Sequence, residues 1–175
     1  MEFEPGGAQV ENQQPVMTGE ITVTPTPDGG RILEAELILP RPLDELFSFF
    51  SDASNLERIT PSMLHFHILT PQPIVMAEGV LIDYKLRIHG IPVKWRTRIS
   101  AWEPNHRFVD EQIRGPYRRW IHEHTFDAVE GGTRCRDRVA YRAPGGALVS
   151  RWLVDRDVRA IFGYRHQRLI ALLSG

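Results

Sequence analysis

Two histidines stand two residues apart, at His122 and His124, in a segment where apolar and polar residues alternate. On a β-strand this spacing points both side chains to the same face, so the two imidazoles are expected side by side. Imidazole titrates near neutral pH, and it can transfer protons, anchor a polar ligand or bind a metal ion. Asp110, Asp137 and Tyr141 lie on the alternating segments before and after, so they are the candidate partners of the histidines.

The segments around the histidines predict an antiparallel meander over residues 95–141. Turn-forming residues separate its strands at 103–106, 115–117 and 131–132. Counting through a two-residue turn at 131–132 gives the expected register of the last two strands. That register places Phe126 opposite Asp137, His124 opposite Val139, and His122 opposite Tyr141.

The length of the turn at Gly115 decides which carboxylate faces the histidines, because a slip of one residue exchanges the two faces of a strand. A two-residue turn aligns with the histidines the set Val109, Glu111 and Ile113. A three-residue loop over 115–117 instead aligns the set Phe108, Asp110 and Gln112. The corner at 103–106, counted from the preceding strand, also favours the second set. Asp110 and Gln112 are therefore expected on the inner face, and Glu111 takes the place of Asp110 if the turn has two residues.

The chosen register predicts a row of inward side chains across neighbouring strands, Ile99–Asp110–His122–Tyr141, with Thr97–Gln112–Trp120 beside it. A carboxylate at Asp110 would orient the His122 imidazole and favour its protonated form, which makes this pair a candidate general acid and base. The row can equally anchor the polar end of a ligand. It can also be a buried network that only satisfies its own hydrogen bonds.

The rest of the chain predicts the elements that carry this meander. A strand over 31–39 precedes an amphipathic helix over about 42–50, and a second short helix begins near Ser54, where the spacing to Glu57 is typical of a capping box. Strands over 64–69 and 80–88 follow, and a turn at 89–90 leads into the meander. A long helix over about 147–173 ends the chain. The order is one strand, two helices, six strands and a C-terminal helix.

Composition bounds the class of protein. The chain has 175 residues, a formal net charge of −1 and 42% hydrophobic residues, which fits one globular domain over 31–175 with a flexible extension over 1–30. The single cysteine, Cys135, excludes an internal disulfide. No apolar run is long enough for a membrane span and the acidic N-terminus does not resemble a signal peptide, so a cytoplasmic protein without integral membrane association is expected. Outward arginines face acidic residues across the strands, so no nucleic-acid partner is expected.

Several runs of residues resemble a known family. They are the run 39–47, the run 52–61 with Ile59-Thr60-Pro61, the run 108–112, Gly115-Pro116-Tyr117, Trp120, His122, His124, Phe126, Gly132-Thr133, Asp137 and Tyr141. Over about residues 31–173 the chain resembles the START-like or SRPBCC superfamily, and within it the bacterial polyketide cyclase/dehydrase-like ligand-binding branch. The resemblance implies an α+β helix-grip fold, in which a curved seven-stranded antiparallel sheet wraps a long C-terminal helix and leaves a hydrophobic cavity between them.

Three functions follow from this combination of residues and resemblance. The first is binding of a hydrophobic or aromatic small molecule, lipid- or polyketide-like, between the sheet and the last helix. The residues expected to line that site are Tyr84, Trp95, Gln112, Trp120, His124, Phe126, Asp137 and Tyr141, with Asp110 and His122 beside them. The second is a cyclase or dehydratase in which His122 and Asp110 transfer protons. The third is a scaffold for protein contacts through the outward Val109, Ile113 and Ile121.

His122 and His124 could also chelate a metal ion, with Asp137 or Asp110 as the third ligand. No cysteine cluster supports such a site, and the aromatic neighbours suit an organic ligand better. The sequence therefore predicts neither a metal nor a nucleotide cofactor. It leaves open whether the chain forms a homodimer.

Overall fold

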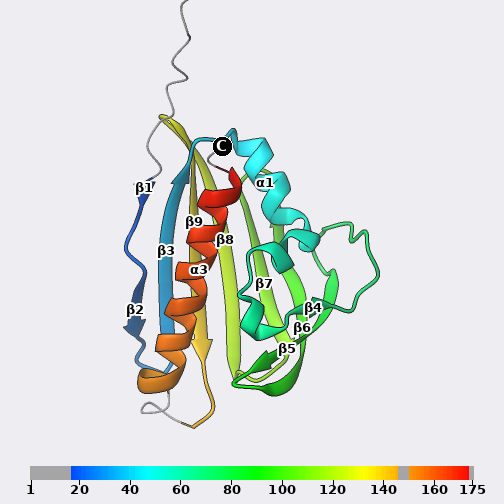
Figure 1. The fold of residues 1–175 in the computed structure, drawn as a ribbon, viewed down its shortest axis with the longest axis vertical. Helices are drawn as coiled ribbons and strands as arrows, with labels where there is room; N and C mark the ends of the chain where they lie inside the picture. Colours follow the sequence, from blue (N-terminus) through cyan, green and yellow to red (C-terminus); the bar gives the residue numbers. More distant parts are fainter. Residues whose placement is uncertain (1–16, 146–149, 174–175) are drawn as a thin grey trace, which may run out of the picture.

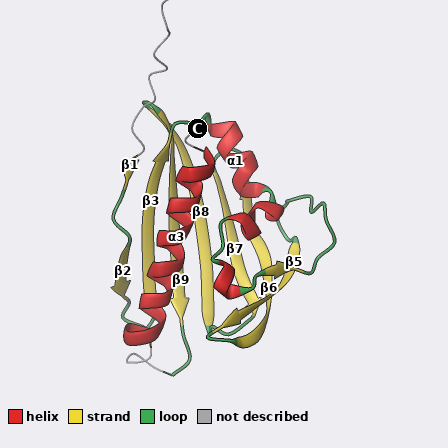
Figure 2. Ribbon diagram, in the orientation of Figure 1, coloured by secondary structure: helices red, strands yellow, loops and turns green. Residues whose placement is uncertain are grey.

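The computed structural model describes residues 17–145 and 150–173. A curved antiparallel sheet wraps around the long C-terminal helix α3, Asp155–Leu173, and the shorter helices cover the remaining part of the same face (Figures 1 and 2). The strands are β1 Met17–Thr18, β2 Thr22–Pro25, β3 Arg31–Leu39, β4 His67–Ile68, β5 Leu81–Ile88, β6 Ile91–Glu103, β7 Arg107–Arg114, β8 Arg119–Val129 and β9 Gly132–Arg142. This is the α+β helix-grip arrangement that the sequence predicted.

Within residues 17–145 and 150–173 the sheet has nine strands, where seven were expected. Its order is β1-β3-β9-β8-β7-β6-β5-β4, and β2 also pairs with β3. The two additional strands, β1 and β2, come from the N-terminal segment expected to be flexible, and they pair with β3 at the edge of the sheet. Residues 1–16 of that segment lie outside the described part. The strand expected over 64–69 is also shorter, because only His67 and Ile68 pair, with Lys85 and Tyr84.

Alternating burial shows which face of the sheet holds the core. In β3 the residues at every second position are buried, and Leu33, Leu37 and Leu39 are almost fully inaccessible to solvent. β9 follows the same period, with Val139 and Tyr141 at 0% exposure. All these side chains project toward α3, so the inner face of the sheet and the buried face of the helix share one core.

Helix α1, Leu43–Ser51, begins directly after Pro42 and buries Leu46 and Phe47 against the sheet. The second short helix differs from the prediction. It is the 3₁₀ helix η1, Ala53–Arg58, and its N-cap is Asp52, whose carboxylate accepts a hydrogen bond from the Ser54 backbone N–H at 2.9 Å. The capping box expected from Ser54 does not form, because the N-cap lies two residues earlier, at Asp52. A further 3₁₀ turn, η2, spans Ser62–Leu64.

The register between β6, β7 and β8 places Asp110 inside. Asp110 pairs with Ile99 on one side and with His122 on the other, as predicted. Glu111 points to the outer face, where it accepts a hydrogen bond from Arg98 at 2.8 Å. The predicted turn at 89–90 is also confirmed, and it pairs Tyr84 of β5 with Trp95 of β6.

The predicted register between β8 and β9 is wrong by two residues. Val129 pairs with Gly132, so the two-residue turn lies at 130–131 rather than at 131–132. Gly131 supplies the left-handed φ of 85° that this turn requires. Gly132 has a different reason to be glycine, since a Cβ there would lie 2.0 Å from the carbonyl oxygen of Leu39. The correction moves Tyr141 opposite Trp120 and brings Asp137 opposite His124.

Helix α3 follows a π-helical turn, η3, Ser150–Val154. The start expected near residue 147 lies outside the described residues. Val158, Phe162, His166 and Leu169 form the buried stripe of α3. Within the described ranges, no helix is both long and apolar enough to cross a membrane.

Candidate functional site

A cavity of about 410 Å³ lies between the sheet, α3 and the short helices. Its walls are mostly apolar and aromatic, with Phe49 and Phe50 from α1, Phe108 from β7, and Phe162 from α3. Six of the predicted site residues line it: Tyr84, Trp95, Asp110, Trp120, His122 and His124. A space of this size suits a small organic molecule.

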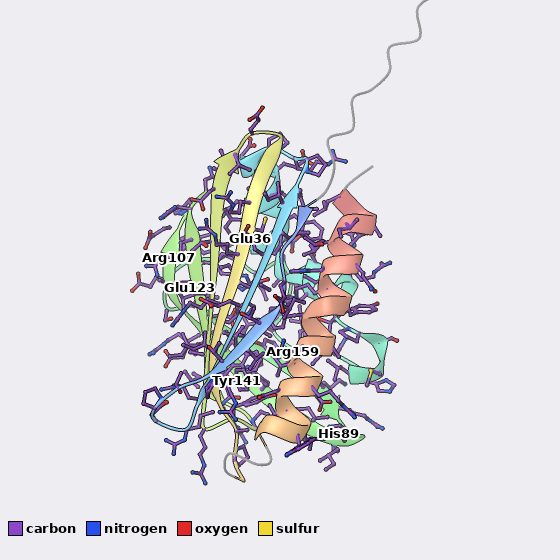
Figure 3. The ribbon with its side chains drawn as sticks, turned by 90° about the vertical axis from the view of Figure 1, so that its left-hand side faces the viewer. Glu36, His89, Arg107, Glu123, Tyr141 and Arg159 are labelled. Atoms are coloured by element: carbon purple, nitrogen blue, oxygen red, sulfur yellow. The ribbon has the colours of Figure 1, made fainter. Side chains whose placement is uncertain are left out.

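The other four predicted site residues have structural partners instead. The Gln112 amide donates to the Tyr117 carbonyl at 2.7 Å and accepts from the Tyr117 N–H at 3.2 Å, so it holds the loop between β7 and β8. Tyr141 donates to Asp155 at 2.7 Å and lies between the sheet and α3 (Figure 3). Phe126 packs in the aromatic core beside α1. The fourth, Asp137, contacts both histidines and does not line the cavity.

Asp110, His122, His124 and Asp137 form one buried cluster, named here the His–Asp cluster. The two imidazole rings are in contact, with their centroids 3.8 Å apart and their planes tilted by 37°. Asp137 lies on one side of the pair: His122 Nε2 donates to Asp137 Oδ1 at 2.8 Å, and His124 Nδ1 approaches the same oxygen to 2.8 Å without hydrogen-bond alignment. Asp110 lies on the other side, where it accepts from His124 Nε2 at 3.2 Å.

The register of β8 and β9 assembles this cluster. His122 and His124 come from alternate positions of β8, and Asp137 stands directly opposite His124 on β9. Asp110 arrives from β7, opposite His122. Had the turn been at 131–132, Tyr141 would have occupied the place beside His122, and Asp137 would have lain beside Phe126.

The electrostatics of the cluster distinguish its two histidines. Burial lowers the pKa of His122, and the neighbouring charge of His124 lowers it further, which outweighs both carboxylates. Burial also acts to lower the pKa of His124, but its contacts with Asp110 and Asp137 outweigh burial and raise that pKa. A proton on this pair is therefore favoured on His124 over His122.

Both carboxylates of the cluster stay ionised. Burial raises the pKa of Asp137, but the hydrogen bonds and charges of the two histidines outweigh it and hold the pKa well below its usual range. For Asp110 burial acts in the same upward direction, and the histidines again prevail and lower the pKa. Two ionised carboxylates therefore face one favoured proton, on His124, so the cluster keeps a net negative charge out of contact with most of the solvent.

The sequence paired the wrong carboxylate with His122. Asp110 was expected to orient His122 and favour its protonation, but its oxygen lies 3.5 Å from His122 Nδ1, too far for a hydrogen bond. Asp110 bonds His124, and Asp137 orients His122. A proton on a histidine of the cavity wall is therefore favoured on His124.

Among the polar residues of the cavity wall that were not predicted, Arg165 lies nearest to the cluster in its electrostatic effect. Arg165 of α3 lines the cavity, its guanidinium lies over the Phe162 ring at 5.0 Å, and its charge acts on Asp110. Its Nε is buried without a hydrogen-bond partner among the described residues. The signal was present in the sequence, since Arg165 follows Phe162 by three residues and precedes Leu169 by four, which places it on the buried face of the helix.

The aromatic wall continues from the cluster toward the tip of the β5–β6 hairpin. Trp95 contacts both Tyr84 and Trp120, with ring centroids 6.2 Å and 5.5 Å away. At the tip, His89 bonds Asp157 at 2.7 Å and so ties the hairpin to the first turn of α3 (Figure 3). Both residues line the cavity, so this contact forms part of its wall between the hairpin and α3.

The outer face of the sheet is a surface of paired charges. Arg107 bonds Glu123 at 2.8 Å on the side away from α3, and Arg136 bonds Asp127 at 3.0 Å (Figure 3). The apolar patch expected from Val109, Ile113 and Ile121 is not a continuous exposed surface, because Val109 is only 8% exposed. The scaffold hypothesis loses the surface on which it depended.

Comparison with known proteins places this geometry in a wider group. The family model described as "Polyketide cyclase / dehydrase and lipid transport" matches residues 39–162, which include all four residues of the His–Asp cluster. No protein with a curated description matches the sequence.

Solved structures show the same fold at low sequence identity. A protein from Mycobacterium smegmatis is 18% identical, covers 91% of this chain and 98% of its own, and superposes with a TM-score of 0.65. A protein from Chromobacterium violaceum is 13% identical, with coverage of 82% and 98% and a TM-score of 0.66. The ginseng major latex-like protein 151 from Panax ginseng is 11% identical, with coverage of 81% and 96% and a TM-score of 0.61. At these identities the likeness concerns the fold alone.

Proposed function

The chain belongs to the polyketide cyclase/dehydrase and lipid transport family, and from this we propose that it binds a hydrophobic or aromatic small molecule in the cavity between its sheet and α3. The observation that supports the proposal is the cavity itself, whose aromatic walls surround the buried His–Asp cluster. A ligand with an apolar body and one polar end matches that division of the walls.

The polar end of the ligand would meet the cluster side of the cavity. Asp110 is the most accessible member of the cluster, with 20% of its side chain exposed, against 6% and 7% for His122 and His124. The Arg165 guanidinium adds a cation near the same carboxylate. A hydroxyl, carbonyl or carboxylate group of the ligand would find donors and acceptors here, while Trp95 and Trp120 contact its apolar body.

A second function, proton transfer, has one observation in its favour. His124 is the histidine on which a proton is favoured, and it faces the cavity and is oriented by Asp110, as a general acid of a cyclase or dehydratase would be. In this proposal His124 takes the role that the sequence assigned to His122. The two functions differ in one result: a carrier returns its ligand unchanged, and an enzyme does not.

Native mass spectrometry of gently purified protein tests the binding proposal, followed by titration with medium-chain fatty acids and hydroxylated aromatic compounds. The informative variant is Ala160→Trp, because Ala160 lines the cavity from α3 yet is exposed, so its side chain is not needed for the core. Gln167→Trp is the matched control, at an exposed position of the same helix away from the cavity. Binding is expected in the wild type and the control, and it should be lost or strongly weakened in Ala160→Trp. Equal binding by both variants would place the ligand elsewhere.

A further inference from the structure

We propose that Asp110, His122 and His124 form a binding site for a divalent transition-metal ion, with Asp137 holding both imidazoles from behind. Each of the three can present one ligand atom so that all three atoms lie within 4.8 Å of one another. Two imidazoles and one carboxylate suit Zn²⁺ or Fe²⁺, whereas Mg²⁺ and Ca²⁺ take mainly oxygen ligands. The inference does not depend on the proposed ligand, and it reverses the sequence-based expectation that no metal is bound.

Two of the distances within the cluster match those between the ligand atoms of a metal ion. Asp110 Oδ2 lies 3.2 Å from His124 Nε2 and 3.5 Å from His122 Nδ1. A tetrahedral ion with bonds of about 2.0–2.2 Å holds its ligand atoms about 3.3–3.6 Å apart. The second gap is too long for a hydrogen bond, and it leaves the His122 ring nitrogen facing a carboxylate oxygen. A cation between them would coordinate both.

Asp137 is placed as the outer partner of such a site. His122 uses Nε2 to bond Asp137, which leaves Nδ1 directed toward Asp110. His124 has the opposite arrangement, with Nδ1 beside Asp137 and Nε2 toward Asp110. One oxygen, Asp137 Oδ1, thus orients His122 through a hydrogen bond and contacts His124 Nδ1, and the other nitrogen of each ring lies on the Asp110 side. Imidazoles that bind metal ions are usually held in this way by a carboxylate.

The site opens to the cavity on the side where an additional ligand would enter. Asp110, His122 and His124 line the cavity, and Asp137 does not. Three protein ligands leave at least one position of the ion for water or for an oxygen of a bound molecule. The apolar walls around the cluster, among them Phe108, which stacks on His124 at 4.2 Å, limit access of bulk water to that position.

The test is calorimetric titration of chelator-treated, dialysed full-length protein with ZnCl₂, with CoCl₂ and visible absorption as a second probe. The wild type is expected to bind one ion per chain, with Co²⁺ bands typical of nitrogen and oxygen ligands. Asp110→Asn and His124→Asn should weaken binding by more than about a hundredfold, and Asp137→Asn by about tenfold to a hundredfold, as for an orienting carboxylate. His106→Ala, which removes an exposed histidine outside the cluster, should bind like the wild type.

Thermal unfolding with and without ZnCl₂ supplies a second readout for variants of reduced stability. The ion should raise the melting temperature of the wild type and of His106→Ala, and it should leave that of Asp110→Asn unchanged. No ion bound by the wild type overturns the proposal. Binding that persists at equal affinity in Asp110→Asn and His124→Asn overturns it as well, because the ion would then lie elsewhere.

Discussion

The His–Asp cluster makes a quantitative prediction for the substitution Asp137→Asn. Asp137 is 6% exposed, accepts a hydrogen bond from His122 at 2.8 Å and lies 2.8 Å from His124. A hydrogen bond to a charged group contributes about 1.5–3 kcal/mol, and breaking a buried ion pair costs about 3–5 kcal/mol. Asparagine keeps the shape of the side chain and one acceptor oxygen. The expected loss of unfolding free energy is therefore near the lower end of the range for a buried ion pair, about 3 kcal/mol.

The pH dependence of this loss has a definite sign. The pKa of Asp137 is lowered in the folded protein, so its contribution is present above the ordinary carboxyl pKa of about 4 and is lost as the pH falls through the lowered value. The pKa of His124 is raised, so the contribution of its charge is present below about 6.5 and is lost as the pH rises through the raised value. The difference between wild type and variant should therefore be largest between about pH 5 and pH 6.

Urea denaturation measures this difference at pH 3, 5.5 and 8, in buffer with a chelator so that no metal ion contributes. Asp127→Asn is the matched control, since Asp127 is in β8 and pairs with Arg136 on the exposed face, where such a pair contributes at most about 1 kcal/mol. A loss for Asp137→Asn no larger than for the control, or one that is the same at all three pH values, would refute the electrostatic account of the cluster.

Three other substitutions test separate parts of the structure. Phe162→Ala removes a 2% exposed ring that contacts His122 edge-on, and it should cost about 3–5 kcal/mol in urea denaturation. His89→Ala breaks the exposed bond to Asp157, so stability should change by less than about 1 kcal/mol while a bound fluorescent probe dissociates faster in stopped-flow measurements. Gln112→Ala removes two bonds to the loop at Tyr117; a loss of about 1–3 kcal/mol and faster amide exchange in that loop are expected, and unchanged exchange would contradict the clamp.

The fold was predictable because its strands alternate and its breaks carry turn residues. β3, β5 and β9 each bury every second residue or expose one face, and this period identifies strands without further information. The short elements were less predictable. β4 has two residues, and β1 and β2 lack a strong pattern of their own because they are stabilised by pairing with β3.

The sequence was enough to predict which residues form the site, but not which carboxylate lies beside which histidine. Both histidines and Asp110 follow from strand period and from the loop after Gly115. The pairing of Asp137 depended on which of two adjacent glycines sits in the turn. Gly132 is excluded from the turn by its close approach to Leu39, a contact 93 residues away in sequence that no local rule reveals. Arg165 is the opposite case. Its spacing from Phe162 and Leu169 places it on the buried face of α3, so the sequence alone could have identified it.

The four tryptophans allow the most direct test of ligand binding in the cavity, through their indole N–H signals in ¹⁵N NMR spectra. Trp95 and Trp120 line the cavity, Trp102 packs against Phe47 outside it, and Trp152 is 71% exposed. Addition of a ligand selected by mass spectrometry should shift the signals of Trp95 and Trp120 and leave those of Trp102 and Trp152 in place. Shifts confined to Trp152, or no shifts at saturating ligand, would contradict binding between the sheet and α3.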